Sequence, residues 1–231
     1  MIPDRDVDCG QLYERARCEL VERLRACRPE ELATMVPATP AWSVHDVLSH
    51  LVGIAADLNA QAFGGDPDDW TAAQVESRAH DTVAELAAEW DREAPKFEDG
   101  LRLFGYDLGS HFVGDLLQHV ADVRHALGLA HPDDDETLAV ALDAYLVTFE
   151  KALDTAAIGS VELSDGRERW TLGPGSVVAS VTGERYELFR ALGGRRNADQ
   201  VRALHWNGDA DAVLPVVSAY PMPSDPIVEV G

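Results

Sequence analysis

The chain is organised around residues 110–127, which read SHFVGDLLQHVADVRHAL. Apolar side chains recur in this stretch at intervals of three and four residues, the spacing that places them on one face of a helix. They are Phe112, Leu116, Val120, Val123 and Leu127. We therefore predict a helix over 110–127 with one buried face.

A polar stripe of His111, Asp115, His119 and Asp122 borders that apolar face. Residues four apart are neighbours on a helix surface, so Asp115 and His119 can direct a carboxylate and an imidazole to one point. We interpret both as ligands of a divalent metal ion, with Asp122 orienting the His119 imidazole from behind. The alternative is a half-buried polar stripe with satisfied hydrogen bonds, in which Asp122 is an exposed charge paired with Arg124 or His125.

A second helix is predicted to begin after Ser43, which forms a capping-box pattern with Asp46 three residues later. His50 lies at the edge of the apolar face of this helix, and we take it as the third ligand. Gly53 costs about 1 kcal/mol in a helix, so we expect it to provide clearance for a neighbouring group. Two imidazoles and one carboxylate suit Zn²⁺ or another divalent first-row ion, with positions left open for water or substrate.

The rest of the chain divides where its periodicity changes. Further helices are predicted over 7–27, 71–94 (closed by Pro95) and 137–157, with an irregular segment over 96–109. After residue 158 short alternating runs replace the helical pattern, first as a hairpin around Asp165-Gly166. We expect further strands at 176–183 and 199–206, helices at 183–194 and 209–220, and a loose tail. The predicted fold is α+β, mostly α: a helical bundle over 1–133, a connecting helix over 134–158 and a small α+β domain over 159–231.

The composition narrows the class of protein. The chain has 231 residues, 46% of them hydrophobic, and its 19 basic and 41 acidic residues give a net charge of −22. Nucleic acid and anionic membranes repel so acidic a chain, so we predict neither as a partner. No apolar run approaches the roughly 20 residues of a membrane span, and the first residues lack the apolar region of a signal peptide. We therefore expect a cytoplasmic protein.

Other chemistries find little support in the sequence. Cys9, Cys18 and Cys27 lie nine residues apart in a predicted helix, about 13 Å from one to the next, beyond the reach of a disulfide. The chain has no G-x-S-x-G motif and no phosphate-binding glycine loop. The basic cluster Gly194-Arg195-Arg196 follows a predicted helix, where it either complements the helix dipole or binds an anion.

Two motifs carry a resemblance to a known family. Residues 42–51, WSVHDVLSHL, resemble the W-[ST]-V-x-D-[VL]-L-x-H-L signature of the mycothiol-dependent maleylpyruvate isomerase family, a branch of the DinB-like metal-binding bundles. Residues 115–128 resemble the E-x-x-x-H-x-x-D-[LIV]-R-x-A-x-G segment of that family. In the C-terminal part, Val181-Thr182-Gly183, Gly194-Arg195 and Trp206-Asn207-Gly208-Asp209 resemble further family elements.

The resemblance implies an up-down, DinB-like four-helix bundle with a metal between its helices, followed by a C-terminal α+β domain. Its metal ligands map onto His50, Asp115 and His119, and Asp115 stands where the family typically has Glu. The family reaction implies that an open metal position binds the thiolate of a low-molecular-weight thiol such as mycothiol. The thiolate adds to an activated cis double bond, the adduct rotates, and elimination gives the trans isomer. An arginine of the C-terminal domain would hold the substrate carboxylate, for which Arg195 is our candidate.

Three functions remain open at this point. The first is a metal- and thiol-dependent isomerase or S-transferase acting on a small electrophilic acid. The second is a metal-dependent enzyme that uses bound water without a thiol. The third is a non-catalytic module that binds a small molecule or a partner. The expected oligomeric state is a monomer or a homodimer.

Overall fold

The computed structural model describes residues 2–230, which form two compact units. One contains Val7–Pro132 with residues 229–230, and the other contains residues 2–6 with Asp133–Val228. The helix over 134–158, predicted as a connecting element between two domains, packs within the second unit. The structure as a whole is mostly helical with small sheets, which confirms the predicted α+β, mostly α fold.

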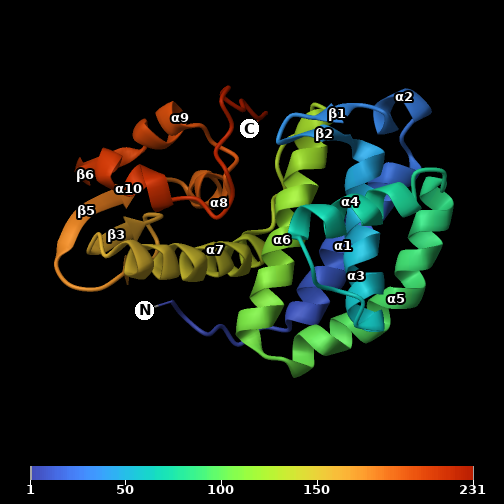
Figure 1. Ribbon diagram of the computed structural model, residues 1–231, viewed down its shortest axis with the longest axis horizontal. Helices are drawn as coiled ribbons and strands as arrows, with labels where there is room; N and C mark the ends of the chain where they lie inside the picture. Colours follow the sequence, from blue (N-terminus) through green and yellow to red (C-terminus); the bar gives the residue numbers. More distant parts are fainter. Residues whose placement is uncertain (1, 231) are drawn as a thin grey trace. The chain divides into compact units, whose positions relative to one another are not determined.

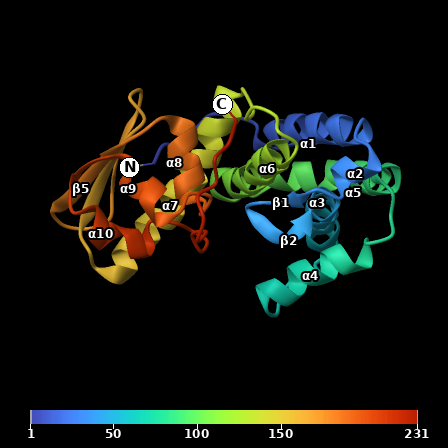
Figure 2. The ribbon, with the colours of Figure 1, turned by 90° about the horizontal axis from the view of Figure 1, so that it is seen from above.

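The first unit is a helical bundle whose four long helices are α1, α3, α5 and α6 (Figure 1). Its long helices close a ring of contacts in which α1 packs on α5 and α6, while α3 packs on the same two helices. A two-stranded hairpin leads into α3, and α4 lies beside α3 (Figures 1 and 2). The elements are α1 (Cys9–Arg25), α2 (Pro29–Leu32), β1 (Met35–Val36), β2 (Thr39–Ser43), α3 (Val44–Ala60), α4 (Pro67–Ser77), α5 (Val83–Leu103) and α6 (Tyr106–Ala126).

Three predictions about this unit are wrong. The helix predicted over 71–94 is interrupted, since α4 ends at Ser77 and α5 begins at Val83. The other two predictions concern Pro95. The proline does not end its helix, and residues 96–109 are not irregular, because α5 continues to Leu103 and α6 begins at Tyr106. The buried stripe of α5 explains the outcome, since it continues at helical spacing on both sides of the proline. Its members are Leu86, Trp90, Ala94, Phe97 and Leu101. Burial of this face outweighs the cost of about 3 kcal/mol that a proline imposes inside a helix.

The second unit packs helices against a four-stranded sheet. The strand order is β4-β3-β5-β6, in which β3 pairs antiparallel with β4 and parallel with β5, and β5 pairs antiparallel with β6. Helix α7 contacts β4 and α8. The elements are α7 (Asp135–Ala156), β3 (Ser160–Ser164), β4 (Arg169–Leu172), β5 (Val177–Thr182), α8 (Arg185–Leu192), α9 (Ala198–Arg202), β6 (His205–Gly208), α10 (Ala210–Val213) and the 3₁₀ turn η1 (Leu214–Val216).

The hairpin predicted at Asp165-Gly166 is confirmed, with Ser164 opposite Arg169 in the register of β3 and β4. The strand predicted over 199–206 is wrong in its first half. Asn197 and Gln200 form a capping box that starts α9, and the strand begins only at His205. The tail is not loose throughout, because Ile227 is buried and exchanges hydrogen bonds with the Gln200 side chain. In the segment 199–206, local capping by Asn197 and Gln200 therefore overrides the alternating pattern that predicted a strand.

No helix within residues 2–230 combines the length and the apolar character that crossing a membrane requires.

Candidate metal centre

The structure brings His50, Asp115 and His119 together inside the helical bundle. Each offers one ligand atom, and these atoms all lie within 4.8 Å of one another. His50 comes from α3, and Asp115 and His119 come from successive turns of α6, which packs against α3. Both imidazoles are buried, and Asp115 is half-buried. Among the described residues 2–230, this is the one group of His, Cys, Asp and Glu side chains found with that spacing.

The start of α3 fixes the position of His50. Ser43 and Asp46 form the predicted capping box, in which each side chain bonds the backbone N–H of the other. Trp42, the residue before the cap, places its indole ring 4.9 Å from the His50 ring and 6.4 Å from the His119 ring. The two imidazoles stand edge to face at 5.2 Å. The Trp42 ring therefore lines one side of the site.

The His50 imidazole is held in its neutral form. Burial, followed by the nearby His119, lowers the pKa of His50 to about 4, against the opposing effects of Asp115 and of Gln74. Its Nδ1 lies 2.8 Å from Oε1 of Gln74, a buried side chain on α4. A neutral imidazole with one nitrogen engaged in this way has the other nitrogen, Nε2, available as a ligand.

His119 faces a carboxylate on each side. Its Nε2 lies 4.0 Å from Oδ1 of Asp115, and its Nδ1 lies 3.5 Å from Oδ2 of Asp122. The second contact lacks hydrogen-bond geometry, so the buried Nδ1 has no hydrogen-bond partner among the described residues. Asp122 is fully buried, which rules out the exposed charge that the sequence left open. Its role in orienting His119 stays a prediction.

The buried side chain of Tyr13 interacts electrostatically with Asp115. Tyr13 of α1 is buried, and its ring packs against Trp90 and Phe97 of α5. Burial, and after it the charge of Asp115, raises the pKa of the Tyr13 phenol above its ordinary value. The Tyr13 phenol therefore stays protonated to a higher pH than an exposed tyrosine does.

The sequence analysis missed Gln74, although Gly53 pointed toward it. A Cβ atom on Gly53 would lie 2.6 Å from Cγ and 2.7 Å from Cβ of Gln74. Gly53 thus makes room for the side chain that bonds His50, and the predicted clearance is confirmed. The chemistry of Gln74 has no signal in the sequence, because its partner lies 24 residues away on another helix.

Arg195 belongs to the other unit. It is buried there, its Nη1 donates to the Gly193 carbonyl at 2.8 Å, and its guanidinium lies 5.5 Å from the centre of the Tyr220 ring. These contacts fix the guanidinium within the C-terminal unit, and its role toward a substrate stays a prediction.

The donor set fits a divalent first-row ion. Two imidazoles and a carboxylate are ligands that Zn²⁺ prefers. Nδ1 of His50 lies at hydrogen-bonding distance from Gln74 Oε1, and Nδ1 of His119 lies 3.5 Å from the Asp122 carboxylate. A tetrahedral zinc ion with ligands at about 2.0–2.1 Å separates its donor atoms by about 3.3 Å. The 4.0 Å between His119 and Asp115 is wider. Side-chain rotation of the short Asp115 would have to close the difference.

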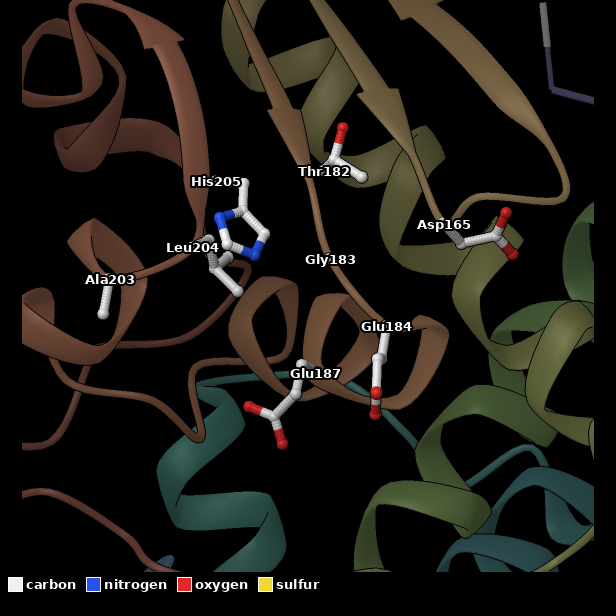
Figure 3. Close-up of a pocket in the computed structure, with 8 residues that line it drawn as sticks. All are labelled: Asp165, Thr182, Gly183, Glu184, Glu187, Ala203, Leu204 and His205. Carbon is white, nitrogen blue, oxygen red and sulfur yellow. The ribbon is translucent and has the colours of Figure 1, made fainter.

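A separate hollow of about 350 Å³ lies in the C-terminal unit (Figure 3). Carboxylates of Asp165, Glu184 and Glu187 line it together with His205. Arg185 already pairs with Asp165, and an arginine from the loop after α8 pairs with Glu187. Two of the three carboxylates are thus neutralised within the unit, and we assign no ligand to this hollow.

Comparisons with known proteins agree with this fold. Residues 13–109 match the family described as "Mycothiol maleylpyruvate isomerase N-terminal domain", a range that includes His50 and ends before Asp115. A crystal structure of a mycothiol-dependent maleylpyruvate isomerase, mutated from histidine to alanine at one position, is similar with a TM-score of 0.52. The two share 15% sequence identity, and the match covers 87% of this chain and 93% of that one.

A second crystal structure of a mycothiol-dependent maleylpyruvate isomerase has a TM-score of 0.50 and 16% identity, covering 81% of this chain and 88% of that chain. No curated protein matches the sequence. At these identities the solved structures show a shared fold, and the family match covers residues 13–109 of the helical unit.

Proposed function

We propose that this chain, whose residues 13–109 match the mycothiol maleylpyruvate isomerase N-terminal domain, is a metal- and thiol-dependent isomerase or S-transferase acting on a small electrophilic acid. The observation that carries the proposal is the convergence of His50, Asp115 and His119, three potential ligands on two helices, on one buried point. A maleylpyruvate-like cis-enoyl acid is the proposed substrate, and a mycothiol-type thiol is the proposed cosubstrate. The proposed compartment is the cytoplasm, where such thiols stay reduced.

In this proposal His50 and His119 hold the ion through Nε2, and Asp115 holds it through its carboxylate. The bound ion, most simply Zn²⁺, would lower the pKa of a thiol so that it reacts as a thiolate near neutral pH. Trp42 shields the two imidazoles from solvent on one side and offers a flat apolar surface to a planar enoyl group. Asp122 stabilises the orientation of His119 from behind.

The proposed reaction is balanced without any oxidant or reductant. The thiolate forms a C–S bond at one carbon of the cis double bond, and the electron pair of the π bond moves onto the activating carbonyl. Rotation about the resulting single bond precedes elimination. The C–S bond then breaks, the double bond reforms in the trans geometry, and the thiolate leaves unchanged. A substrate carboxylate needs a cationic partner, and Arg195 is the proposed one because a guanidinium binds a carboxylate through two hydrogen bonds.

Turnover of a cis-enoyl acid, with and without a low-molecular-weight thiol, tests this proposal. We expect zinc-loaded protein to isomerise the substrate only when thiol is present. His50→Ala should abolish this activity, while His111→Ala, which removes an exposed histidine from the same helix as His119, should leave it unchanged. Turnover without thiol would overturn the proposed mechanism in favour of bound water, and full ligand binding by a His50→Ala/His119→Ala double variant without turnover would favour a binding module.

A further inference from the structure

A continuous chain of hydrogen bonds runs from the surface of α4 to the candidate metal centre. Trp70 Nε1 donates to Asp57 Oδ2 at 2.8 Å, and Gln74 Nε2 donates to the same oxygen at 2.9 Å. The other end of the Gln74 amide, Oε1, lies 2.8 Å from His50 Nδ1. Gln74 is only 2% exposed, so water does not compete for either end of its amide.

The donor and acceptor properties of these groups fix the direction of the chain. An indole N–H can only donate, and an ionised carboxylate can only accept. Asp57 therefore requires the NH₂ end of the Gln74 amide, which leaves the carbonyl end, Oε1, for His50. A carbonyl oxygen can only accept, so the proton of the neutral His50 imidazole lies on Nδ1. The lone pair of Nε2 is then directed away from Gln74.

Helix α3 is built to admit this side chain. Gly53 lies one turn after His50, and any side chain there would meet Cβ and Cγ of Gln74. Asp57 lies one further turn along, so three residues on one face of α3 receive a single glutamine. Trp70 and Gln74 of α4 both donate to Asp57 of α3, so these bonds hold α4 against α3. The bond from Gln74 also fixes which nitrogen of His50 carries the proton.

We propose that Gln74 is a positioning residue, which holds the His50 proton on Nδ1 and thereby presents Nε2 to the other two side chains of the trio. The consequence for metal binding rests on the function proposed above, whereas the placement of the proton does not. Partners that hold a ligand histidine from behind typically contribute 10- to 100-fold to metal affinity. A leucine at position 74 would leave Nδ1 buried without an acceptor. The Asp115 carboxylate, within 4.8 Å, would then draw the proton toward Nε2.

Nitrogen-15 NMR of the histidine rings in metal-free protein tests the placement directly, because the two neutral tautomers have distinct ring-nitrogen shifts. We expect His50 to carry its proton on Nδ1 in the wild type and to shift toward the Nε2–H tautomer in Gln74→Leu. Asn59→Ala is the matched control, since it removes another side-chain amide that bridges α3 to a neighbouring helix, through Glu93. It should leave the His50 tautomer unchanged.

A double variant separates the effect of the hydrogen bond to His50 from the effect of side-chain packing at position 74. Gln74→Glu combined with Asp57→Asn exchanges the amide and the carboxylate, so position 74 still accepts from His50 Nδ1 while position 57 still accepts from Trp70. This double variant should restore the Nδ1–H tautomer that Gln74→Leu loses. An Nε2–H tautomer in the wild type, or an unchanged tautomer in Gln74→Leu, would overturn the proposal.

Competition for Zn²⁺ against a chromophoric chelator provides the second measurement. Gln74→Leu should bind zinc 10- to 100-fold more weakly than the wild type, and Asn59→Ala should bind it equally well. If the wild type shows the Nδ1–H tautomer but binds no zinc, the positioning role of Gln74 stands and the proposed function fails. Wild-type zinc affinity in Gln74→Leu would overturn the claimed consequence of the positioning.

Discussion

Replacing Gly53 by alanine should destabilise the protein, although the same change in most helices is stabilising. Alanine is better than glycine in a helix interior by about 1 kcal/mol. At Gly53, however, the new Cβ would lie 2.6 Å from Gln74 Cγ and 2.7 Å from Gln74 Cβ. Both atoms are close to the backbone of α4, so a rotation at the far end of the side chain cannot relieve the overlap. Overpacking of this kind costs about 1–3 kcal/mol.

Gly100 provides the matched control, because it lies in α5 and a Cβ there would meet Phe104 at an ordinary 3.8 Å. Gly100→Ala should therefore gain about 1 kcal/mol. The two variants should differ in their free energy of unfolding by about 1–3 kcal/mol, measured by urea denaturation of metal-free protein. Gly53→Ala should also bind zinc more weakly, because Gln74 is pushed away from His50. Equal stabilisation by both substitutions would refute this account of the α3–α4 contact.

Three further predictions follow from the site. The pKa of His50 is lowered to about 4 in the folded protein. As the pH falls, the unfolded chain therefore binds a proton at His50 at a higher pH than the folded chain does. The free energy of unfolding of metal-free protein, followed by chemical denaturation, should fall between about pH 7 and pH 5 by about 2 kcal/mol more than that of His50→Gln. Equal pH dependence would contradict a buried neutral imidazole. Asp115→Glu should tighten zinc binding about tenfold in chelator competition, because one more methylene lets the carboxylate close the 4.0 Å separation from His119. Weaker binding by this variant would contradict the claim that Asp115 is too short for the site. Arg195→Lys should raise the KM for the acid about tenfold if Arg195 binds the carboxylate, and a lower melting temperature with unchanged KM would assign it to packing.

The sequence predicts the elements whose signals are local. The capping box at Ser43, the hairpin at Asp165-Gly166 and the apolar stripe of α6 all depend on residues within one or two turns of each other. The proximity of Asp115 and His119 follows from the same rule, since they lie four residues apart on one helix.

The parts that the sequence does not predict depend on distant contacts. Pro95 lies inside α5 because a buried face continues past it, which only the packed bundle makes favourable. Gln74 reaches His50 from another helix, and Trp42 meets both imidazoles only after β2 turns the chain into α3. The sequence leaves open whether Asp122 lies behind His119 or is exposed, and only the packed structure shows that it is fully buried. Such pairings have no fixed spacing along the chain.

The most direct test of the central claim is the metal content of the purified protein, measured by elemental mass spectrometry after loading with zinc and removal of unbound ion. Wild type and His111→Ala should each carry close to one equivalent, and His119→Ala should carry almost none. A wild type that holds no metal after loading would contradict the claim that His50, Asp115 and His119 form a metal centre, as would a His119→Ala variant that keeps a full equivalent.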